Sequence, residues 1–314
     1  MSLEPFFSVA IPLYNKESYI TDTLKNIFAQ EFNDFEVVIV DDGSTDNGAI
    51  KVQELNDSRI RLYTQENKGA SAARNAAIEK CNGKFIAVLD ADDSWEPLHL
   101  QHLKELIENF PEAVMYCTNY QLRRENDVMI PARFSFSYHQ KPLLIDDFFD
   151  GMKQFGIATS SSTAFRKETF KKAGGYDTRI RSGQDTDLWI KVALQGKTAF
   201  HPAITMTYNS FDNSSLSSAQ LYKARALMLD NFTKQEKINQ SLKSFLDLNR
   251  YAIAISAKLA GDLDFYNNIV HQIKMTNLNK KQRFLLWLPV KVLKQLQLLQ
   301  DFLIKRGIYL TAYR

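Results

Sequence analysis

The sequence predicts an α/β protein, with a mostly parallel sheet covered by helices on both faces and a helical extension at its C-terminal end. Three observations support this fold class. Between residues 6 and 90, short apolar runs alternate with segments whose apolar residues recur at helical spacing. Acid-rich polar clusters follow some of these runs, where an open parallel sheet places its ligand crevice. After Ser218 the helical spacing continues to the end of the sequence.

The predicted strands and helices follow in a regular order. We expect strands at FSVAIPLY, FEVVIVDD, RIRLYTQ and KFIAVLD, with a helix after each of the first three. Because these runs are largely apolar, they predict strands buried on both faces and joined by right-handed crossovers. Pro97 suits the first turn of the next helix, and AVMYCTNYQL predicts another strand. Residues 123–152 are expected to be irregular and to face the substrate. A strand, a short helix, a Gly-Gly turn and a helix that starts near Gln184 follow.

The composition limits the class of protein. A chain of 314 residues with 45% hydrophobic content can bury one large domain and a smaller appendage. A net charge of +3 is too small to hold nucleic acid, so we expect no nucleic-acid partner. Cys81 and Cys117 lack a metal-ligand spacing, which fits a reducing compartment. There is no secretory signal pattern, and no apolar run approaches the roughly 20 residues that span a bilayer. The expected location is cytoplasmic, or peripheral at the inner face of the plasma membrane.

The stretch FIAVLDADDSWEP places three carboxylates, Asp90, Asp92 and Asp93, directly after an apolar strand. Helix capping is one explanation, because Asp93 or Ser94 could cap the helix that contains Pro97. Capping leaves Asp90 unexplained. A divalent cation would relieve the repulsion, since Mg²⁺ and Mn²⁺ take oxygen ligands. Such an Asp-x-Asp pair is weak evidence on its own.

Two further clusters fit a bound nucleotide. Asp41 and Asp42 begin DDGSTD, and an ionised carboxylate there could accept the ring N–H of a nucleobase, although turn chemistry explains the Gly-Ser-Thr that follows. In ENKGASAARN, Lys68 and Arg74 could balance a diphosphate, while Gly69 would let the backbone approach it. A solvated helix start explains the same basic residues equally well.

Together these stretches resemble a known family. SVAIPLYNKESYI, VVIVDDGSTD, NKGASAARN, FIAVLDADD, GGYD and QDTDLW stand in the order and spacing of the family-2 glycosyltransferases. The resemblance covers about residues 6–217, and the combination of VDDGSTD with LDADD is its most specific part. It implies a GT-A fold, which has a Rossmann-like sheet, and an inverting transferase that uses a nucleotide-diphosphate sugar, most often a uridine one.

The resemblance also implies roles for single residues. The first nucleotide-binding loop would contain Pro12, Tyr14 and Glu17, with Tyr14 near the base, and Asp41 would contact uracil. The other implied donor-binding residues are Asp42, Asn67, Lys68, Gly69, Arg74 and Asp90, the last of them close to the ribose. Asp92 matches the direct metal ligand, Asp90 is a second one, and Asp93 could substitute in either role. The implied cofactor is a divalent metal, Mn²⁺ or Mg²⁺, which would bridge the two phosphates.

Asp185 in SGQDTDLW occupies the second position of the Glu-Asp pair that is usual in the family. The resemblance therefore implies that Asp185 is the general base that deprotonates the acceptor hydroxyl. Taken alone, Asp185 and Asp187 would be interpreted as stabilising the first turn of the helix LWIKVAL. Trp189 in that helix is expected to be core.

The sequence departs from the family in two places. Gln184 stands where the pair usually begins with Glu, which removes a charge. The stretch MTYNSFDNSSLS lacks a histidine that many relatives carry near the metal. Asp212 could replace this histidine as an oxygen ligand, whereas His201, before Pro202, is expected to end a strand rather than to bind metal.

The chain is expected to divide into a catalytic domain, residues 1–217, and a helical extension, residues 218–314. Residues 1–122 would bind the nucleotide, and residues 123–217 the acceptor. From Lys274 onward the extension carries nine basic residues and only one acid, Asp301, beside an apolar helical stripe. This pattern fits an anionic membrane surface near a lipid-linked acceptor, packing on the catalytic domain, or a homodimer contact.

These observations predict an inverting, metal-dependent enzyme that moves a hexose or N-acetylhexosamine from a UDP-sugar to a glycan or lipid-linked acceptor. The expected setting is the synthesis of bacterial cell-surface polysaccharide. Two alternatives remain open at this point. One is a nucleotidyltransferase that acts on sugar phosphates, and the other is a non-catalytic scaffold that binds nucleotide or glycan.

Overall fold

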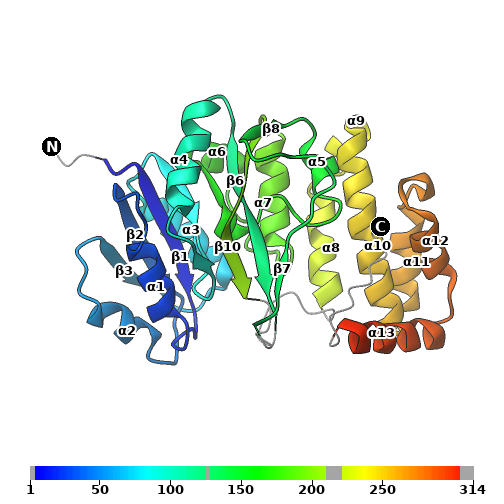
Figure 1. Cartoon of the computed structure of the whole chain (residues 1–314). Helices are drawn as coiled ribbons and strands as arrows, with labels where there is room; N and C mark the ends of the chain where they lie inside the picture. Colours follow the sequence, from blue (N-terminus) through cyan, green and yellow to red (C-terminus); the bar gives the residue numbers. More distant parts are fainter. Residues whose placement is uncertain (1–3, 125–126, 210–220, 305–314) are drawn as a thin grey trace.

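The computed structural model describes residues 4–124, 127–209 and 221–304 (Figure 1). Its strands are β1 (Phe7–Leu13), β2 (Phe35–Asp41), β3 (Ile60–Thr64), β4 (Phe85–Val88), β5 (Ser94–Trp95), β6 (Met115–Arg123), β7 (Met129–Pro131), β8 (Leu143–Ile145), β9 (Thr163–Arg166) and β10 (Thr198–Asn209). Its helices are α1 (Ile20–Phe28), α2 (Gly48–Glu54), α3 (Ala70–Lys80), α4 (His99–Asn109), α5 (Phe148–Gly151), α6 (Lys167–Ala173), α7 (Gln184–Ala193), α8 (Tyr222–Asp230), α9 (Gln235–Ile238), α10 (Gln240–Ala260), α11 (Leu263–His271), α12 (Lys280–Trp287) and α13 (Val290–Ile304).

One sheet runs through the molecule in the order β3-β2-β1-β4-β9-β6-β10-β5, with β7 beside β6 and β8 beside β10. The four strands predicted from the first 90 residues are adjacent and parallel, with Phe7 in register with Phe35 and with Phe85. The α/β prediction is confirmed. Beyond β4 the sheet is mixed, because β9 runs antiparallel between β4 and β6, while β6 and β10 are parallel to each other.

The structure corrects two sequence predictions. His201 does not end a strand but lies inside β10, a strand of 12 residues that the sequence analysis did not predict as a whole. The register of β10 against β6 shifts between His201 and Ile204 and again before Met206. Pro202, which has no backbone N–H, therefore lies where the regular ladder of hydrogen bonds is interrupted. Residues 123–152 are only partly irregular, because they contain β7, β8 and α5. Phe134 in this segment packs edge-on against Phe200 of β10 instead of facing solvent.

Two hydrophobic cores cover the two faces of the sheet. The core on one face includes buried residues of α1 and α4, such as Leu24 and Leu103. The other contains residues of α3 and α7 together with α8 and α10, so Ala77, Trp189 and Leu246 belong to one cluster. The helical extension therefore shares its core with the sheet rather than forming a core of its own.

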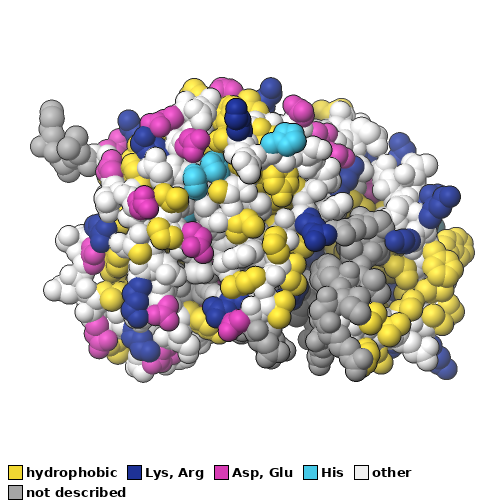
Figure 2. Space-filling view, viewed as in Figure 1, with side chains coloured by type: hydrophobic (Ala, Val, Ile, Leu, Met, Phe, Trp, Pro, Cys, Tyr) yellow, Lys and Arg dark blue, Asp and Glu magenta, His cyan; other side chains and the backbone are white. Residues whose placement is uncertain are grey.

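The extension forms the right-hand part of the molecule in Figure 1, where α10 packs between α8 and α11. Hydrophobic side chains gather over α12 and α13 in the space-filling view (Figure 2). Among the described helices, none is long and apolar enough to cross a bilayer.

Candidate active site

The loops after β1 and β2 are locked to each other. Asn15, with a φ of 50°, accepts a hydrogen bond from the Thr45 N–H at 2.8 Å, and its own N–H donates to Ser44 Oγ at 3.0 Å. Glu17 accepts from the Asn47 N–H at 3.1 Å, and this bond lowers the pKa of the Glu17 carboxyl. Glu17 thus lies in the predicted loop, but its carboxylate holds that loop against the start of α2. Tyr14 in the same loop is 47% exposed.

Asp41 and Asp42 are both buried at the end of β2, and their carboxylates have different partners. Asp41 Oδ1 accepts a hydrogen bond from the Ser44 N–H at 3.1 Å. Asp42 accepts from the Lys68 N–H at 2.9 Å, from the Gly69 N–H at 2.8 Å and from Gln65 at 2.7 Å. Asp42 therefore fixes the loop that precedes α3, including Gly69 at a φ of +89°. Asn67 and Lys68 themselves point outward and are exposed.

Arg74, on α3, is buried between two carboxylates. Its Nη2 lies 2.5 Å from Asp90 Oδ1, and its Nη1 lies 3.8 Å from Asp185 Oδ1. Burial lowers the pKa of Arg74, but the charges of Asp90 and Asp185 outweigh this effect and raise it, so the guanidinium stays charged. Its Nε and Nη1 are buried without a hydrogen-bond partner in the described part of the chain. The N–H groups on Nε and Nη1 of Arg74 could therefore donate hydrogen bonds to an anionic ligand.

The acids after β4 do not cap the next helix. The N-cap position of α4 is Leu98, and no side chain among the described residues caps it. Asp93 instead turns inward, where it accepts from Ser161 Oγ at 2.5 Å and from the Asn209 N–H at 3.1 Å. Asp92 lies nearer the surface, with its Oδ2 2.8 Å from Lys16 Nζ. The capping explanation for this cluster is therefore wrong.

Negative charge is crowded at this strand end. Burial and the charge of Asp90 raise the pKa of Asp92, although Lys16 opposes the shift. Burial and the charges of Asp90 and Asp92 raise the pKa of Asp93 well above its usual range. The raised pKa values show that too little positive charge lies near these carboxylates to balance them, and a divalent cation with oxygen ligands would supply it.

Asp185 lies in the first turn of α7, a helix that begins at Gln184. Gly183 precedes it at a φ of +85°, and Ser160 Oγ donates to Asp185 Oδ1 at 2.8 Å. Burial raises the pKa of Asp185, the charge of Arg74 lowers it, and the net shift is upward. The neighbouring Gln184 is buried, and its Oε1 has no hydrogen-bond partner within the described residues.

Asp187 and Trp189 have structural roles on the same helix. Asp187 is buried and accepts from Asn231 Nδ2 at 2.7 Å, which joins α7 to the end of α8. Lys191 Nζ lies 2.5 Å from its other oxygen. Trp189 is buried in the core, as predicted. Only Asp185 of these acids lies next to Arg74.

Sequence reasoning missed several residues that build the site. Ser160 and Ser161 bond to Asp185 and to Asp93, and Ser161 Oγ also accepts from the Asp90 N–H at 3.0 Å. The run of three serines before β9 was the available signal. Tyr176, in the GGYD motif, is buried with its ring centroid 5.5 Å from the Arg74 guanidinium.

Asn209, at the end of β10, is the other missed residue. Its Nδ2 donates to the Asp92 backbone oxygen, and its Oδ1 is buried without a hydrogen-bond partner among the described residues. An orphaned buried oxygen next to Asp92 is a fitting ligand for a hard cation. Asn209 belongs to the stretch that lacks the family histidine. Asp212, proposed above for that role, lies outside the described residues.

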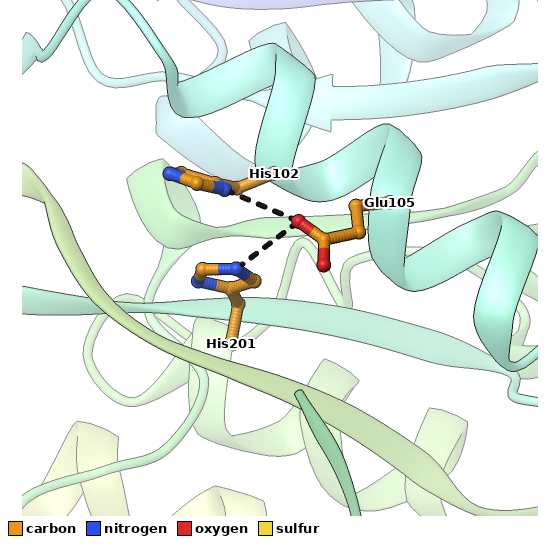
Figure 3. Close-up of side chains that lie close together, drawn as sticks. All are labelled: His102, Glu105 and His201. Atoms are coloured by element: carbon orange, nitrogen blue, oxygen red, sulfur yellow. Dashed lines mark hydrogen bonds and ion pairs between the residues drawn. The ribbon is translucent and has the colours of Figure 1, made fainter. Parts of the chain in front are cut away.

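A second cluster of titratable groups lies away from this site (Figure 3). Glu105 Oε2 on α4 is 3.5 Å from His102 Nδ1 and 3.4 Å from His201 Nε2, and the two rings stack at 3.9 Å. The Ala203 N–H donates to His201 Nδ1 at 3.1 Å. Nδ1 must therefore be unprotonated, so Nε2 carries the proton and donates to Glu105. This tautomer leaves no lone pair on Nε2 for a metal, and the cluster is a hydrogen-bonded one.

Comparisons with known proteins identify the family of this chain. The family model for glycosyl transferase family 2 matches residues 8–174. The chain is 30% identical over 218 residues to TuaG of Bacillus subtilis (strain 168), a protein assigned provisionally by its name to teichuronic acid biosynthesis. The matched region covers 68% of this chain and 82% of TuaG. It is also 27% identical over 266 residues to an uncharacterized glycosyltransferase of Rickettsia bellii. That match covers 81% of this chain but only 37% of the longer Rickettsia protein.

A solved structure shares the fold. The complex of Staphylococcus aureus TarS (residues 1–349) with UDP-GlcNAc superposes with a TM-score of 0.59 at 18% identity, over 87% of this chain and 93% of that one. The chain therefore belongs to glycosyl transferase family 2, and it is a glycosyltransferase with a GT-A-type fold.

Proposed function

We propose that this glycosyltransferase moves a hexose or N-acetylhexosamine from a UDP-sugar to a hydroxyl group of a glycan or lipid-linked acceptor, with inversion at the anomeric carbon. The observation that carries the proposal is the contact of both Asp90 and Asp185 with Arg74, because it brings the expected donor site next to the expected base. UDP-GlcNAc in the TarS complex supports the donor class. The name of TuaG supports a setting in bacterial surface polysaccharide synthesis.

The donor would lie across the carboxyl ends of β1, β2 and β4. Within the described residues only Oδ1 of Asp41 accepts a hydrogen bond from the loop, so Oδ2 would accept the uracil ring N–H, with the exposed Tyr14 beside the base. The unpartnered N–H groups of Arg74 would donate to the diphosphate, assisted by Lys68. Glu17 and Asp42 would act indirectly, by holding their loops in place.

Asp92, Asp90 and the Asn209 amide oxygen would hold Mn²⁺ or Mg²⁺, which would supply Lewis-acid neutralisation of the diphosphate charge. Asp185 would accept the proton of the acceptor hydroxyl as that oxygen attacks the anomeric carbon. The bond between the anomeric carbon and the phosphate oxygen would break, and UDP would leave with the bonding electrons. Because the attack is opposite to the leaving group, the configuration inverts. The raised pKa of Asp185 suits a base that works near neutral pH.

Product analysis with a panel of UDP-sugars tests the proposal. We expect release of UDP together with incorporation of sugar into the acceptor, and no pyrophosphate. Asp185→Asn should bind UDP as the wild type does but lose transfer by about 10²-fold or more. A chain that binds UDP-sugars without releasing UDP in the presence of acceptors, and that is unaffected by this substitution, would be a scaffold instead.

A further inference from the structure

The last two described helices present hydrophobic side chains to solvent. Trp287 is 86% exposed, Leu298 is 70% exposed and Phe284 is 63% exposed. We call this surface the α12–α13 face, defined by its exposed apolar residues Phe284, Trp287, Val292, Leu296, Leu298 and Leu299. Surface residues of this size and number in one place mark an interaction surface.

The helices that carry the α12–α13 face are packed against the rest of the extension. Leu286 and Leu293 are buried, and Tyr266 Oη of α11 donates to the Leu286 carbonyl at 2.8 Å. A capping box between Asn279 and Gln282 begins α12. The exposed side chains are therefore held in place by the extension rather than left on a loose end.

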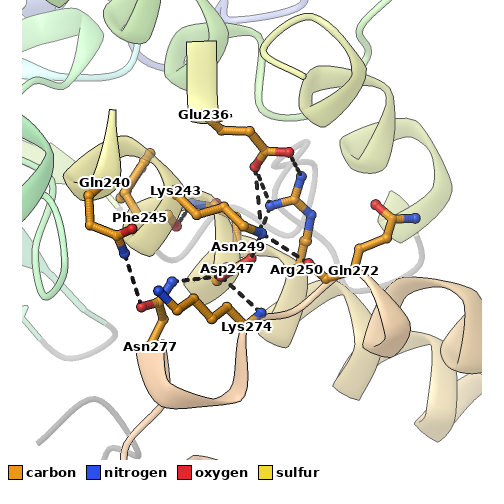
Figure 4. Close-up of polar contacts among 10 residues, drawn as sticks. All are labelled: Glu236, Gln240, Lys243, Phe245, Asp247, Asn249, Arg250, Gln272, Lys274 and Asn277. Carbon is orange, nitrogen blue, oxygen red and sulfur yellow. Dashed lines mark hydrogen bonds and ion pairs between the residues drawn. The ribbon is translucent and has the colours of Figure 1, made fainter. Parts of the chain in front are cut away.

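A buried ionic network holds the segment that leads to α12 (Figure 4). Asp247 of α10 is completely buried and accepts from Lys243 at 2.6 Å, from Arg250 at 3.1 Å and from Asn277 at 2.8 Å. Arg250 also binds Glu236 through two hydrogen bonds, at 2.7 Å and 2.9 Å. Because every charge has an opposite partner at bonding distance, this network can fix α9, α10 and residues 274–277 as one unit.

Positive charge surrounds the α12–α13 face. Lys280, Lys281 and Arg283 lie on α12, and Lys291 and Lys294 lie on α13. These five side chains stand among the exposed residues, whereas the sequence from 274 to 304 contains a single acid, Asp301. Figure 2 shows basic side chains beside the hydrophobic ones in this part of the molecule.

We propose that the α12–α13 face binds the surface of an anionic lipid bilayer. An exposed indole and phenyl ring between lysines suit the headgroup region, where aromatic rings and aliphatic stems enter the boundary and ammonium groups meet lipid phosphates. Each basic residue near such a surface strengthens partition by about fivefold. A second copy of this chain is the less suitable occupant, because a two-fold interface would place the same five basic residues opposite themselves.

Binding in this way would orient the enzyme. In Figure 1, β1 and β10 run toward the lower side of the view, and α13 lies on that same side. The carboxyl ends of these strands carry the candidate active site, so the bilayer would lie near its opening. This consequence for a lipid-linked acceptor rests on the proposed function, whereas the binding of lipid itself does not.

Vesicle flotation of the full chain tests the proposal. We expect binding to vesicles rich in phosphatidylglycerol, none to vesicles of phosphatidylcholine alone, and loss of binding at high salt. Trp95 and Trp189 are buried, so a blue shift of tryptophan emission on binding should come from Trp287 and be absent in Trp287→Phe. Lys291→Glu with Lys294→Glu should lower partition at least tenfold. The matched control reverses two exposed lysines of α6, Lys171→Glu with Lys172→Glu, and should bind as the wild type does.

UDP binding and the melting temperature report whether each variant is folded, and neither depends on lipid. Equal binding to both kinds of vesicle, or binding that the control pair abolishes as well, would overturn the proposal. The proposal would also be overturned if the chain did not bind vesicles. If it then formed a dimer that dissociates in the Lys291→Glu, Lys294→Glu variant, the face would be assigned to a second copy of the chain. Failure of lipid binding with UDP binding intact would leave the proposed function standing.

Discussion

Asp90 and Asp185 contact the same guanidinium, that of Arg74, at 2.5 Å and 3.8 Å. Asp90 follows β4, and Asp185 lies in the first turn of α7. The two carboxylates therefore share one positive charge across the site. An incoming diphosphate would compete for that charge and so change the electrostatic environment of Asp185.

Arg74→Ala should both weaken donor binding and destabilise the fold. The substitution removes the guanidinium that pairs with the partly buried Asp90 carboxylate, and breaking such a pair costs about 3 kcal/mol. Arg74→Lys is the matched control, because it keeps the charge but cannot contact both acids in the same geometry. We expect UDP affinity to fall at least tenfold in Arg74→Ala and by less in Arg74→Lys, measured by calorimetry beside thermal unfolding. Unchanged UDP affinity in both variants would remove Arg74 from the donor site.

Ser160→Ala should shift the pH dependence of transfer. Ser160 Oγ donates to Asp185 Oδ1, and this bond lowers the pKa of Asp185, against the raising effect of burial. Without the bond the pKa rises further, so the base is protonated at a higher pH. The acidic limb of the pH–rate profile should move to higher pH, while Ser160→Thr, which keeps a hydroxyl, should restore the wild-type profile. A uniform loss of rate with an unmoved profile would contradict this role for Ser160.

Asn209→Ala should weaken the dependence of UDP binding on Mn²⁺. The substitution removes the orphaned Oδ1, while the backbone N–H that binds Asp93 remains. Loss of one oxygen ligand should raise the Mn²⁺ concentration needed for half-maximal UDP binding about tenfold. Asn209→His, which introduces a metal ligand of the kind many relatives have, should recover most of the effect. If Asn209→Ala responds to Mn²⁺ as the wild type does, the amide is not a ligand.

Acidification should destabilise the protein partly through His99. This ring is buried, stacks on Trp95 and bonds to Thr205 through Nδ1 at 2.8 Å. Burial lowers its pKa to about 3, below the ordinary value near 6.5, so the unfolded chain binds more protons between these values. The contribution to instability is absent above pH 6.5 and grows to about 2 kcal/mol at pH 5. His99→Gln should therefore lose less unfolding free energy than the wild type between pH 7.5 and pH 5, and equal losses would contradict the assignment.

The first half of the fold could be predicted because β1, β2 and β4 are largely apolar, buried runs separated by segments with helical spacing. The pairing of β4 with β1 instead of β3 depends on contacts distant in the sequence. β10 could not be predicted as one strand, because Pro202 and two register shifts interrupt the alternation that marks a strand. The motif acids were predicted from a resemblance, but the inward orientation of Asp42 and Asp93 was not. Asp42 and Asp93 face inward because of bonds to Gly69 and Ser161, which lie 27 and 68 positions away in the sequence.

The most direct test of the donor site is a calorimetric titration of UDP into the full chain, with and without Mn²⁺, beside Asp92→Ala. Asp92 is the carboxylate of its cluster that matches the direct metal ligand, it is less buried than Asp93, and burial together with the charge of Asp90 raises its pKa. We predict that Mn²⁺ strengthens UDP binding at least tenfold and that Asp92→Ala abolishes this gain while the protein stays folded. UDP binding that ignores both Mn²⁺ and the substitution, or no UDP binding at all, would contradict the account.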